Sequence, residues 1–217
     1  MLDLPTPLLV MSVIGLVAFA ASGAIAGARA GMDWLGLTSL AAVTAIGGGT
    51  VRDLLMATVP GWLRDFWPTV VLIGVTVIIV WIATRAFPWQ RHQRWMGRLF
   101  TISDAIGLAA FTITGTDIAR SAGFGVGPTV VLGVISGIGG GVIRDVLAGR
   151  RVQIFTGEVY ALASIAGSVA FLAVHAVAPA WIASLVGVAI VLVVRLGAVA
   201  LGWRVPTLPG ESTRSDS

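Results

Sequence analysis

Ile46-Gly-Gly-Gly-Thr-Val-Arg-Asp53 and Ile138-Gly-Gly-Gly-Val-Ile-Arg-Asp145 are two copies of one motif. Ile14-Gly-Leu-Val-Ala-Phe19 likewise recurs as Ile106-Gly-Leu-Ala-Ala-Phe111, Gly23 recurs as Gly115, and Ala30-Gly31 recurs as Ala122-Gly123. All of these matches share a single offset with no gap. Two glycine triplets alone would be a weak signal in a glycine-rich chain, but four separate matches at one offset indicate an internal duplication.

The composition indicates an integral membrane protein. Of the 217 residues, 57% are hydrophobic and only 11% are charged, whereas a soluble domain carries roughly 25% charged residues. The net charge is +4, but every basic residue is an arginine placed between hydrophobic blocks, which argues against nucleic acid binding. The chain has no cysteine and two histidines. Disulfides, thiolate catalysis and cysteine metal sites are therefore excluded, and we expect neither a metal nor a cofactor.

Seven apolar blocks are each near the length that crosses about 30 Å of hydrocarbon as a helix. They are Leu8–Ala28, Trp34–Leu55, Thr69–Ala86, Leu99–Ile118, Val126–Ala148, Val159–Val177 and Trp181–Gly202. The first block lacks the basic segment that opens a signal peptide. We therefore predict an all-α protein with seven transmembrane helices in a single transmembrane domain, 1–203. The arginine-rich stretch Pro88–Arg98 is expected to be the longest connection, and 204–217 a disordered cytoplasmic tail.

The duplicated unit contains three spans, which determines how its copies lie in the membrane. Because three is odd, repeat one (about 8–86) and repeat two (about 99–177) must enter from opposite sides as an inverted repeat, an architecture common in transporters. The seventh helix (about 181–202) lies outside the repeat and is assigned to packing or assembly. Arginine placement then predicts an outside N-terminus and a cytoplasmic C-terminus in a bacterial or archaeal cell (inner) membrane. The arginines on the predicted cytoplasmic side are Arg29, Arg85, Arg91, Arg94, Arg98, Arg150, Arg151 and Arg204.

The glycine triplets are the first candidate functional element. They comprise Gly47, Gly48 and Gly49 in the second predicted helix and Gly139, Gly140 and Gly141 in the fifth. Glycine is about 1 kcal/mol worse than alanine in a helix, so three in a row favour a kink or break whose freed carbonyls line a path. The alternative is close packing of helices through small residues.

Charged residues inside the spans are the second candidate element, because ionisable groups in the membrane are usually paired or face water. Arg52 and Asp53 follow the first triplet, and Arg144 and Asp145 follow the second. Their repetition favours a role in lining or gating a pathway, and the alternative is structural pairing. Asp104, whose repeat partner is the neutral Ser12, is either a pathway carboxylate or a helix-start cap.

Hydroxyl groups within the spans are candidates to line an aqueous path. They are Ser22, Thr44, Thr112, Thr114 and Ser136, although such hydroxyls more often bond back to their own helix. His175 and Arg195 lie near predicted span ends, which favours snorkelling or interhelical bonding. No catalytic motif or phosphate-binding loop is present, so we do not expect an enzyme.

The duplicated Gly-Gly-Gly-x-x-Arg-Asp motif, together with Ser103-Asp-Ala-Ile-Gly-Leu-Ala109, resembles the prokaryotic branch of the trimeric intracellular cation (TRIC) channel family. The resemblance covers roughly Leu8 to Gly202. It implies a homotrimer in which each protomer has its own pore for monovalent cations, chiefly potassium, with kinks at the two glycine triplets. The lysine-centred features of eukaryotic members do not carry over, because this chain has no lysine.

Three functions are compatible with this pattern. The first is a potassium-permeable channel, with potassium or sodium ions and membrane lipids as partners and with modest discrimination between the two ions. The sequence lacks the Thr-Val-Gly-Tyr-Gly filter of selective potassium channels. The second is a secondary transporter of a small solute such as glycine, which inverted repeats and broken helices fit equally well. The third is a membrane scaffold without transport.

Overall fold

The structure, a computed structural model, describes residues 6–86, 89–153 and 159–203 as a series of helices. These are α1 (Thr6–Arg29), α2 (Trp34–Leu55), α3 (Gly61–Arg64), α4 (Phe66–Ala86), α5 (Trp89–Ser121), α6 (Val126–Leu147), α7 (Ala161–His175) and α8 (Ala180–Leu201). The all-helical fold predicted from the apolar blocks is confirmed for these residues. The predicted disordered tail, 204–217, lies outside them.

Six of the helices, namely α1, α2, α4, α5, α6 and α8, are long and apolar enough to cross a membrane. The sixth predicted span, Val159–Val177, corresponds to α7, which has only 15 residues. At 1.5 Å per residue such a helix is about 22 Å long, less than the roughly 30 Å of hydrocarbon in a bilayer. A seventh full crossing therefore stays a prediction.

Helix α5 begins about ten residues earlier than the sequence suggested. The stretch Pro88–Arg98 was expected to be a connection, but from Trp89 onward it is the first part of a helix of 33 residues. The physical reason is local: Trp89–Met96 contains neither glycine nor proline, and arginine, glutamine and methionine are good helix formers. The helix therefore continues beyond the apolar block from which its start was predicted.

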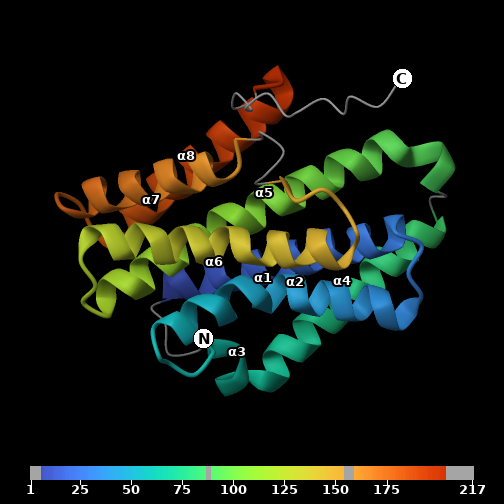
Figure 1. Cartoon of the computed structure of the whole chain (residues 1–217), viewed down its shortest axis with the longest axis horizontal. Helices are drawn as coiled ribbons and strands as arrows, with labels where there is room; N and C mark the ends of the chain where they lie inside the picture. The colour runs from blue at the N-terminus through green and yellow to red at the C-terminus, as the bar shows by residue number, and fades with distance from the viewer. Residues whose placement is uncertain (1–5, 87–88, 154–158, 204–217) are drawn as a thin grey trace, which may run out of the picture.

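The long helices lie side by side in pairs (Figure 1). Helix α1 packs on α2 and α5 packs on α6, while α1 also packs on α5 and α2 on α6. Helix α4 covers α1 and α2, and α7 covers α5 and α6. Helix α8 lies against α7 and α5. The sixteen-membered main core is centred on α1, with Phe19, Ile25, Leu40 and Phe100 among its members.

The outward surface is apolar, as a lipid-facing surface must be. On α4, which the other helices cover least, Val71 is 58% exposed and Ile79 is 61% exposed. On α8, Val193 is 71% exposed. Side chains of this kind would be unfavourable in water over so large an area, so their exposure supports a membrane location.

The two glycine triplets lie where α2 crosses α6. A Cβ atom added to Gly48 would lie 2.2 Å from the carbonyl oxygen of Ser136, and one added to Gly140 would lie 2.2 Å from that of Thr44. Thr44 precedes Gly48 by the same number of residues as Ser136 precedes Gly140, so the contacts are reciprocal and the helices run antiparallel. Only glycine permits so close an approach of the two backbones.

A second reciprocal contact joins α1 to α5. The Phe19 ring lies over Gly107, where an added Cβ would come 2.1 Å from the ring. The Phe111 ring lies over Gly15, where an added Cβ would come 3.2 Å from the ring. The two rings stack on each other with centroids 5.4 Å apart. Residues that match in the duplicated sequence thus make matching contacts at the centre of the molecule.

Gly48→Ala and Gly140→Ala are expected to destabilise the protein. Each new methyl group would collide with a backbone carbonyl that cannot move without separating α2 from α6, and overpacking of this kind costs about 1–3 kcal/mol. The measurement is the thermal midpoint of each purified variant in detergent, followed by fluorescence-detected gel filtration.

Gly74→Ala in α4 is the matched control, because an added Cβ meets nothing within 4 Å there. It is expected to leave the midpoint unchanged or raise it, since alanine is the better helix former. Equal midpoints for Gly48→Ala and Gly74→Ala would contradict the close backbone approach.

Candidate functional site

The first Arg-Asp pair lies near the end of α2 and is held in place by hydrogen bonds from two other segments. Arg52 donates from Nε and Nη2 to Asp53 Oδ1, at 2.8 Å and 2.6 Å, and from Nη1 to Ser136 Oγ at 3.2 Å. The backbone N–H of Gly61 donates to Asp53 Oδ2 at 2.9 Å. The carboxylate therefore binds both its arginine and the loop after α2, and the arginine reaches across to α6.

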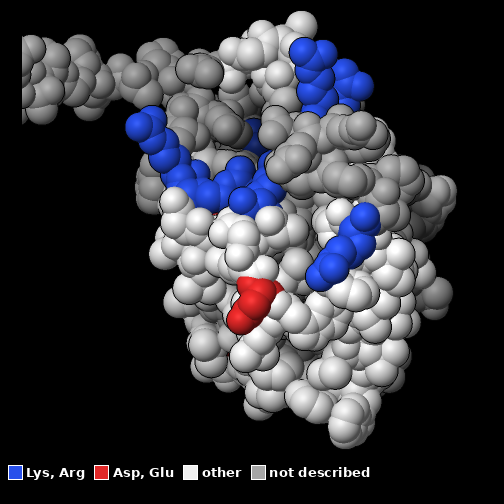
Figure 2. Space-filling model, turned by 90° about the vertical axis from the view of Figure 1, so that its right-hand side faces the viewer, with Lys and Arg blue, Asp and Glu red and all other residues white. Residues whose placement is uncertain are grey.

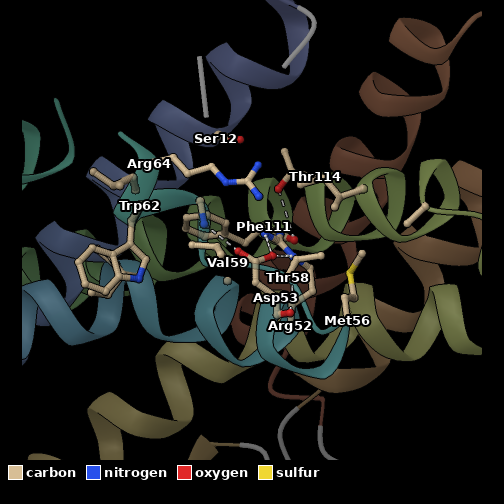
Figure 3. Close-up of a pocket in the computed structure, with 17 residues that line it drawn as sticks. Ser12, Arg52, Asp53, Met56, Thr58, Val59, Trp62, Arg64, Phe111 and Thr114 are labelled. Carbon is tan, nitrogen blue, oxygen red and sulfur yellow. Dashed lines mark hydrogen bonds and ion pairs between the residues drawn. The ribbon is translucent and has the colours of Figure 1, made fainter. Parts of the chain in front are cut away.

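A hollow of about 330 Å³ opens beside this pair (Figure 3). We call it the Arg52 hollow; its lining comes from α1, α2, the segment after α2, and α5, and includes Ser12, Leu16, Gly49, Arg52, Asp53, Thr58, Arg64, Phe111 and Thr114. Figure 3 shows the Arg64 side chain extending toward the middle of the hollow. Polar groups from four segments thus face one space at the end of the molecule where α2 ends.

The second Arg-Asp pair, near the end of α6, lies at the opposite end of the molecule because α2 and α6 run antiparallel. Arg144 is fully buried, with 0% exposure. Its Nε donates to Asp145 Oδ1 at 3.0 Å, and its Nη1 donates to Asp104 Oδ1 at 2.6 Å and to Ser22 Oγ at 2.9 Å. Tyr160 also donates its hydroxyl hydrogen to Asp104 Oδ1, at 3.3 Å. We call Arg144, Asp104, Asp145, Ser22 and Tyr160 the Arg144 cluster.

The two ends carry the same motif but different charge. Arg52 has one carboxylate partner, Asp53, and the pair is neutral. Arg144 has two, Asp104 and Asp145, so its cluster carries a net negative charge. This difference in charge comes from one position. The first copy of the repeated sequence has Ser12 where the second copy has Asp104.

The Arg144 cluster is more fully enclosed than the Arg52 pair, in which Arg52 is 7% and Asp53 6% exposed. Tyr160 fills the space beside α6, and its hydroxyl oxygen lies 2.5 Å from where a Cβ of Gly141 would be. The Phe100 ring covers the cluster from the other side, with the Arg144 guanidinium 4.6 Å from its centroid. The corresponding glycine beside Arg52, Gly49, lines the Arg52 hollow instead.

A second, larger hollow of about 910 Å³ lies beyond Phe100. We call it the basic hollow, because its lining includes Arg29, Arg94, Arg98, Arg150, Arg151 and Arg195. Figure 2 looks at the end where α4 ends and α5 begins, and basic side chains gather on that face. The guanidinium groups of Arg29 and Arg150 lie 5.0 Å and 4.6 Å from the Phe100 centroid. One aromatic ring therefore separates the buried cluster from a strongly basic space.

Between the two hollows lies the aromatic pair at the centre of the molecule. Phe111 lines the Arg52 hollow and stacks on Phe19. Ser22, one turn further along α1, already contacts Arg144. The order from one end to the other is therefore the Arg52 hollow, the two stacked rings, the Arg144 cluster, Phe100 and the basic hollow.

The structure corrects the expected break at the glycine triplets. Helix α2 is continuous through Gly47–Gly49 and α6 through Gly139–Gly141, so their carbonyls are not freed by an interruption. The glycines instead allow the two backbones to approach, which was the alternative from packing. Kinks without a break stay a prediction.

The predicted hydroxyl residues divide by partner. Ser22 and Ser136 accept hydrogen bonds from the motif arginines. Thr44 bonds back to the Leu40 carbonyl oxygen at 2.6 Å. Thr114 bonds back to its own helix and lines the Arg52 hollow. Thr112 pairs with Ser164 of α7 at 2.5 Å, away from both hollows.

Sequence reasoning missed Tyr160, Gln153 and Phe100. Tyr160 is the only tyrosine of the chain, and this is a weak sequence signal for a residue that the structure shows to be 1% exposed. Gln153 and Phe100 carry no comparable signal in the sequence. In the part of the chain that the structure describes, no three histidine or acidic side chains are grouped so as to hold a metal ion.

Comparison with known proteins adds three kinds of similarity. A family model described as Glycine transporter matches residues 9–83 and 101–176. The UPF0126 inner membrane protein YadS of Escherichia coli (strain K12) is 36% identical over 204 residues, which cover 91% of this chain and 94% of YadS. The UPF0126 membrane protein YvgT of Bacillus subtilis (strain 168) is 35% identical over 95% of this chain and 98% of YvgT.

Solved structures of channels are also similar over nearly the whole chain. The TRIC trimeric intracellular cation channel orthologue from Rhodobacter sphaeroides has a TM-score of 0.82 at 32% identity, covering 91% of this chain and all of that one (100%). A second TRIC cation channel structure has a TM-score of 0.79 at 34% identity, covering 94% and 98%.

Arg144→Gln is expected to destabilise the protein more than Arg52→Gln. Removing Arg144 leaves two carboxylates without their cation in a fully buried place, and breaking a buried ion pair in this way costs about 3–5 kcal/mol. Arg52 lies beside a hollow that admits water, so its loss leaves a single carboxylate that can be solvated. The measurement is the thermal midpoint of both variants in detergent.

The double variant Arg144→Gln/Asp104→Asn separates charge from packing. It is expected to recover part of the lost midpoint, because one of the two uncompensated charges is gone. If the double variant were less stable than Arg144→Gln alone, the proposed charge balance of the cluster would be wrong.

Proposed function

Because the chain belongs to the TRIC family, we propose that it is a potassium-permeable channel for monovalent cations and not an enzyme. The observation that carries the proposal is the similarity to solved TRIC cation channels over at least nine-tenths of both chains. Identity above 30% with matching folds makes the same kind of transport the simplest conclusion. The conducted ion and its pathway are argued below from this chain's own residues.

The proposed pathway lies within one protomer and connects the Arg52 hollow to the basic hollow. It runs beside the close crossing of α2 and α6, past the stacked Phe19 and Phe111. We propose that repeat one and repeat two are inverted copies, with α7 as the third crossing of the second copy. Three observations support this: the family model matches two segments, α2 and α6 run antiparallel, and matching residues make matching contacts at Gly48 and Gly140.

Arginines beside a cation pathway must be neutralised, because a bare guanidinium repels the permeant ion. Asp53 neutralises Arg52 at 2.6 Å, and Asp104 and Asp145 outweigh Arg144. The Arg144 cluster is thus a net negative place on the proposed route, which favours cations over anions. Both arginines are assigned to bracing and gating this route, with Asp53, Asp104 and Asp145 as the charges that a cation would encounter.

Selectivity among monovalent cations is proposed to be modest. Ser12, Thr58 and Thr114 line the Arg52 hollow and offer hydroxyl oxygens that replace part of the hydration shell of an ion. Hydroxyls on three separate segments form no ring of fixed carbonyl groups, which is the device that selects potassium strongly.

The proposed assembly is a homotrimer in a bacterial or archaeal inner membrane, with a pathway in each protomer. The trimer follows from the description of the Rhodobacter sphaeroides structure as a trimeric channel, and the membrane from YadS. We propose that the basic end and the C-terminus lie in the cytoplasm, and the excess of arginine at that end supports this orientation.

Single-channel recording tests this function. Purified protein in planar bilayers is expected to give unitary currents that reverse near the potassium equilibrium potential under a potassium chloride gradient, and that persist with reduced size in sodium. Saturable uptake of glycine into proteoliposomes without unitary currents would instead identify the transporter that the family model's description names. If neither current nor uptake were found, the result would favour a membrane scaffold without transport.

A cysteine scan of two residues in α1 tests the pathway. Ser12→Cys, in the Arg52 hollow, is expected to react with a small charged thiol reagent added from the α2-end side, and the reaction should reduce the potassium current. The natural chain has no cysteine, so the signal comes from the introduced thiol alone.

Ile14→Cys is the matched control. It lies in the same helix, two residues away, and is 48% exposed, on the surface assigned to lipid. Its reaction should leave the current unchanged. A current that is insensitive to reagent at Ser12→Cys would place the pathway elsewhere.

A further inference from the structure

Helix α8 lies outside both segments that the family model matches, 9–83 and 101–176, yet it carries a buried arginine. Arg195 is 3% exposed. Placing a guanidinium in a membrane helix is costly, and such residues are usually paired and functional. Sequence position alone suggested snorkelling or interhelical bonding for Arg195, and the structure identifies two of its partners.

Two of the described residues that Arg195 contacts, Tyr160 and Gln153, reach the Arg144 cluster. Its guanidinium lies over the Tyr160 ring, 4.8 Å from the centroid, and Tyr160 donates to Asp104 Oδ1. Its Nη2 donates to the side-chain oxygen Oε1 of Gln153, whose backbone N–H donates to Asp145 Oδ2 at 3.3 Å. Both routes therefore end on a carboxylate that pairs with Arg144.

Within the described residues, the Arg52 end has no counterpart of these contacts. Gly61 holds Asp53 through its backbone N–H as Gln153 holds Asp145, but glycine has no side chain to bind a further residue. Pro68 stands at the position that matches Tyr160. The end that lacks the tyrosine and the glutamine is the one where the motif arginine, Arg52, lines a hollow.

Arg195 also has space into which it can withdraw. Its side chain lines the basic hollow together with Arg150 and Arg151, so one side of the guanidinium meets Tyr160 and another meets a space of about 910 Å³. A movement toward that space would release Tyr160 and Gln153 without displacing α8.

We propose that Arg195 of α8 is a latch that holds the proposed pathway shut at the basic end, with Tyr160 and Gln153 as the parts it holds. In the latched state, the Tyr160 hydroxyl holds Asp104 and the Gln153 backbone N–H holds Asp145, so that both carboxylates stay paired with Arg144. Release of Arg195 frees Tyr160 to move away from Gly141. A space then opens beside Gly141 that corresponds to the Arg52 hollow beside Gly49. The latch rests on the proposed channel function.

Arg195 and Tyr160 are positioning residues in this scheme, so the readout is the ratio of open to closed time and not the size of the current. Wild type is recorded first in planar bilayers with potassium chloride on both sides. Arg195→Gln is expected to raise the open-to-closed ratio about tenfold, as the loss of a charge-assisted hydrogen bond implies. Tyr160→Phe, which keeps the ring and loses the hydroxyl, is expected to raise it by a smaller factor.

Two further variants distinguish a latch from a general effect of charge. Arg195→Lys keeps a cation over the Tyr160 ring and should stay near the wild-type ratio. Arg85→Gln removes the same charge from an exposed residue of α4 that lines neither the Arg52 hollow nor the basic hollow, and should also leave the ratio near wild type. In the double variant Arg195→Gln/Tyr160→Phe, the two effects should be less than multiplicative because both act on one contact.

The outcomes separate the two proposals. An unchanged or lower ratio in Arg195→Gln, or equal shifts in Arg195→Gln and Arg85→Gln, overturns the latch, whereas currents from the wild type still support the channel. Wild type without any potassium current overturns the channel itself, and the latch with it. If Arg195→Gln does not elute as the wild-type oligomer in gel filtration, Tyr160→Phe decides alone: a raised ratio supports the latch, and an unchanged ratio overturns it.

Discussion

At Gly48 and Gly140 the backbones of α2 and α6 lie so close that a single methyl group on either helix would reach a carbonyl oxygen of the other. A bilayer supplies little hydrophobic force between helices, because lipid tails are as apolar as leucine, so contact of this kind holds membrane helices together. The rest of the structure depends on it. The approach brings Ser136 within reach of Arg52 and places α6 so that Arg144 reaches Ser22 on α1.

Identical motifs in two places need not have identical chemistry. Arg52 and Arg144 each pair with the next residue in the chain, but among the described residues a second carboxylate reaches Arg144 and none reaches Arg52. One substitution between the copies, Ser12 against Asp104, changes the local charge from neutral to negative. The added tyrosine and phenylalanine then exclude water from Arg144, and in such surroundings unpaired charge is far more costly than beside the Arg52 hollow. The motif arginine thus lines a hollow at one end of the molecule and is fully buried at the other.

Charge also distinguishes the two hollows at these ends. The Arg52 hollow is lined by a neutral ion pair, Arg64 and several hydroxyls, whereas six arginines line the basic hollow. Aromatic rings between guanidinium groups, as at Phe100, let these cations stay close together because each gains from the ring face. For the proposed channel, the approach of a cation from the basic end is therefore the electrostatically harder one, and any opening there must depend on Asp104 and Asp145.

Composition, apolar block length and the repeated motif determined by themselves that this chain is a helical membrane protein, that α2 and α6 carry the same motif, and that each motif arginine has an aspartate beside it. These follow from local physics: block length against bilayer thickness, and residues adjacent in the chain. Only the tertiary structure decided that the glycines pack instead of breaking their helices, that α5 extends to Trp89, and that α7 is short. It also decided which arginine Asp104 binds, 40 residues away, and that Gln153 and Tyr160 connect Arg195 to the same cluster. Contacts of that separation leave no periodicity or spacing in the sequence, since they arise only when helices distant in the chain pack together.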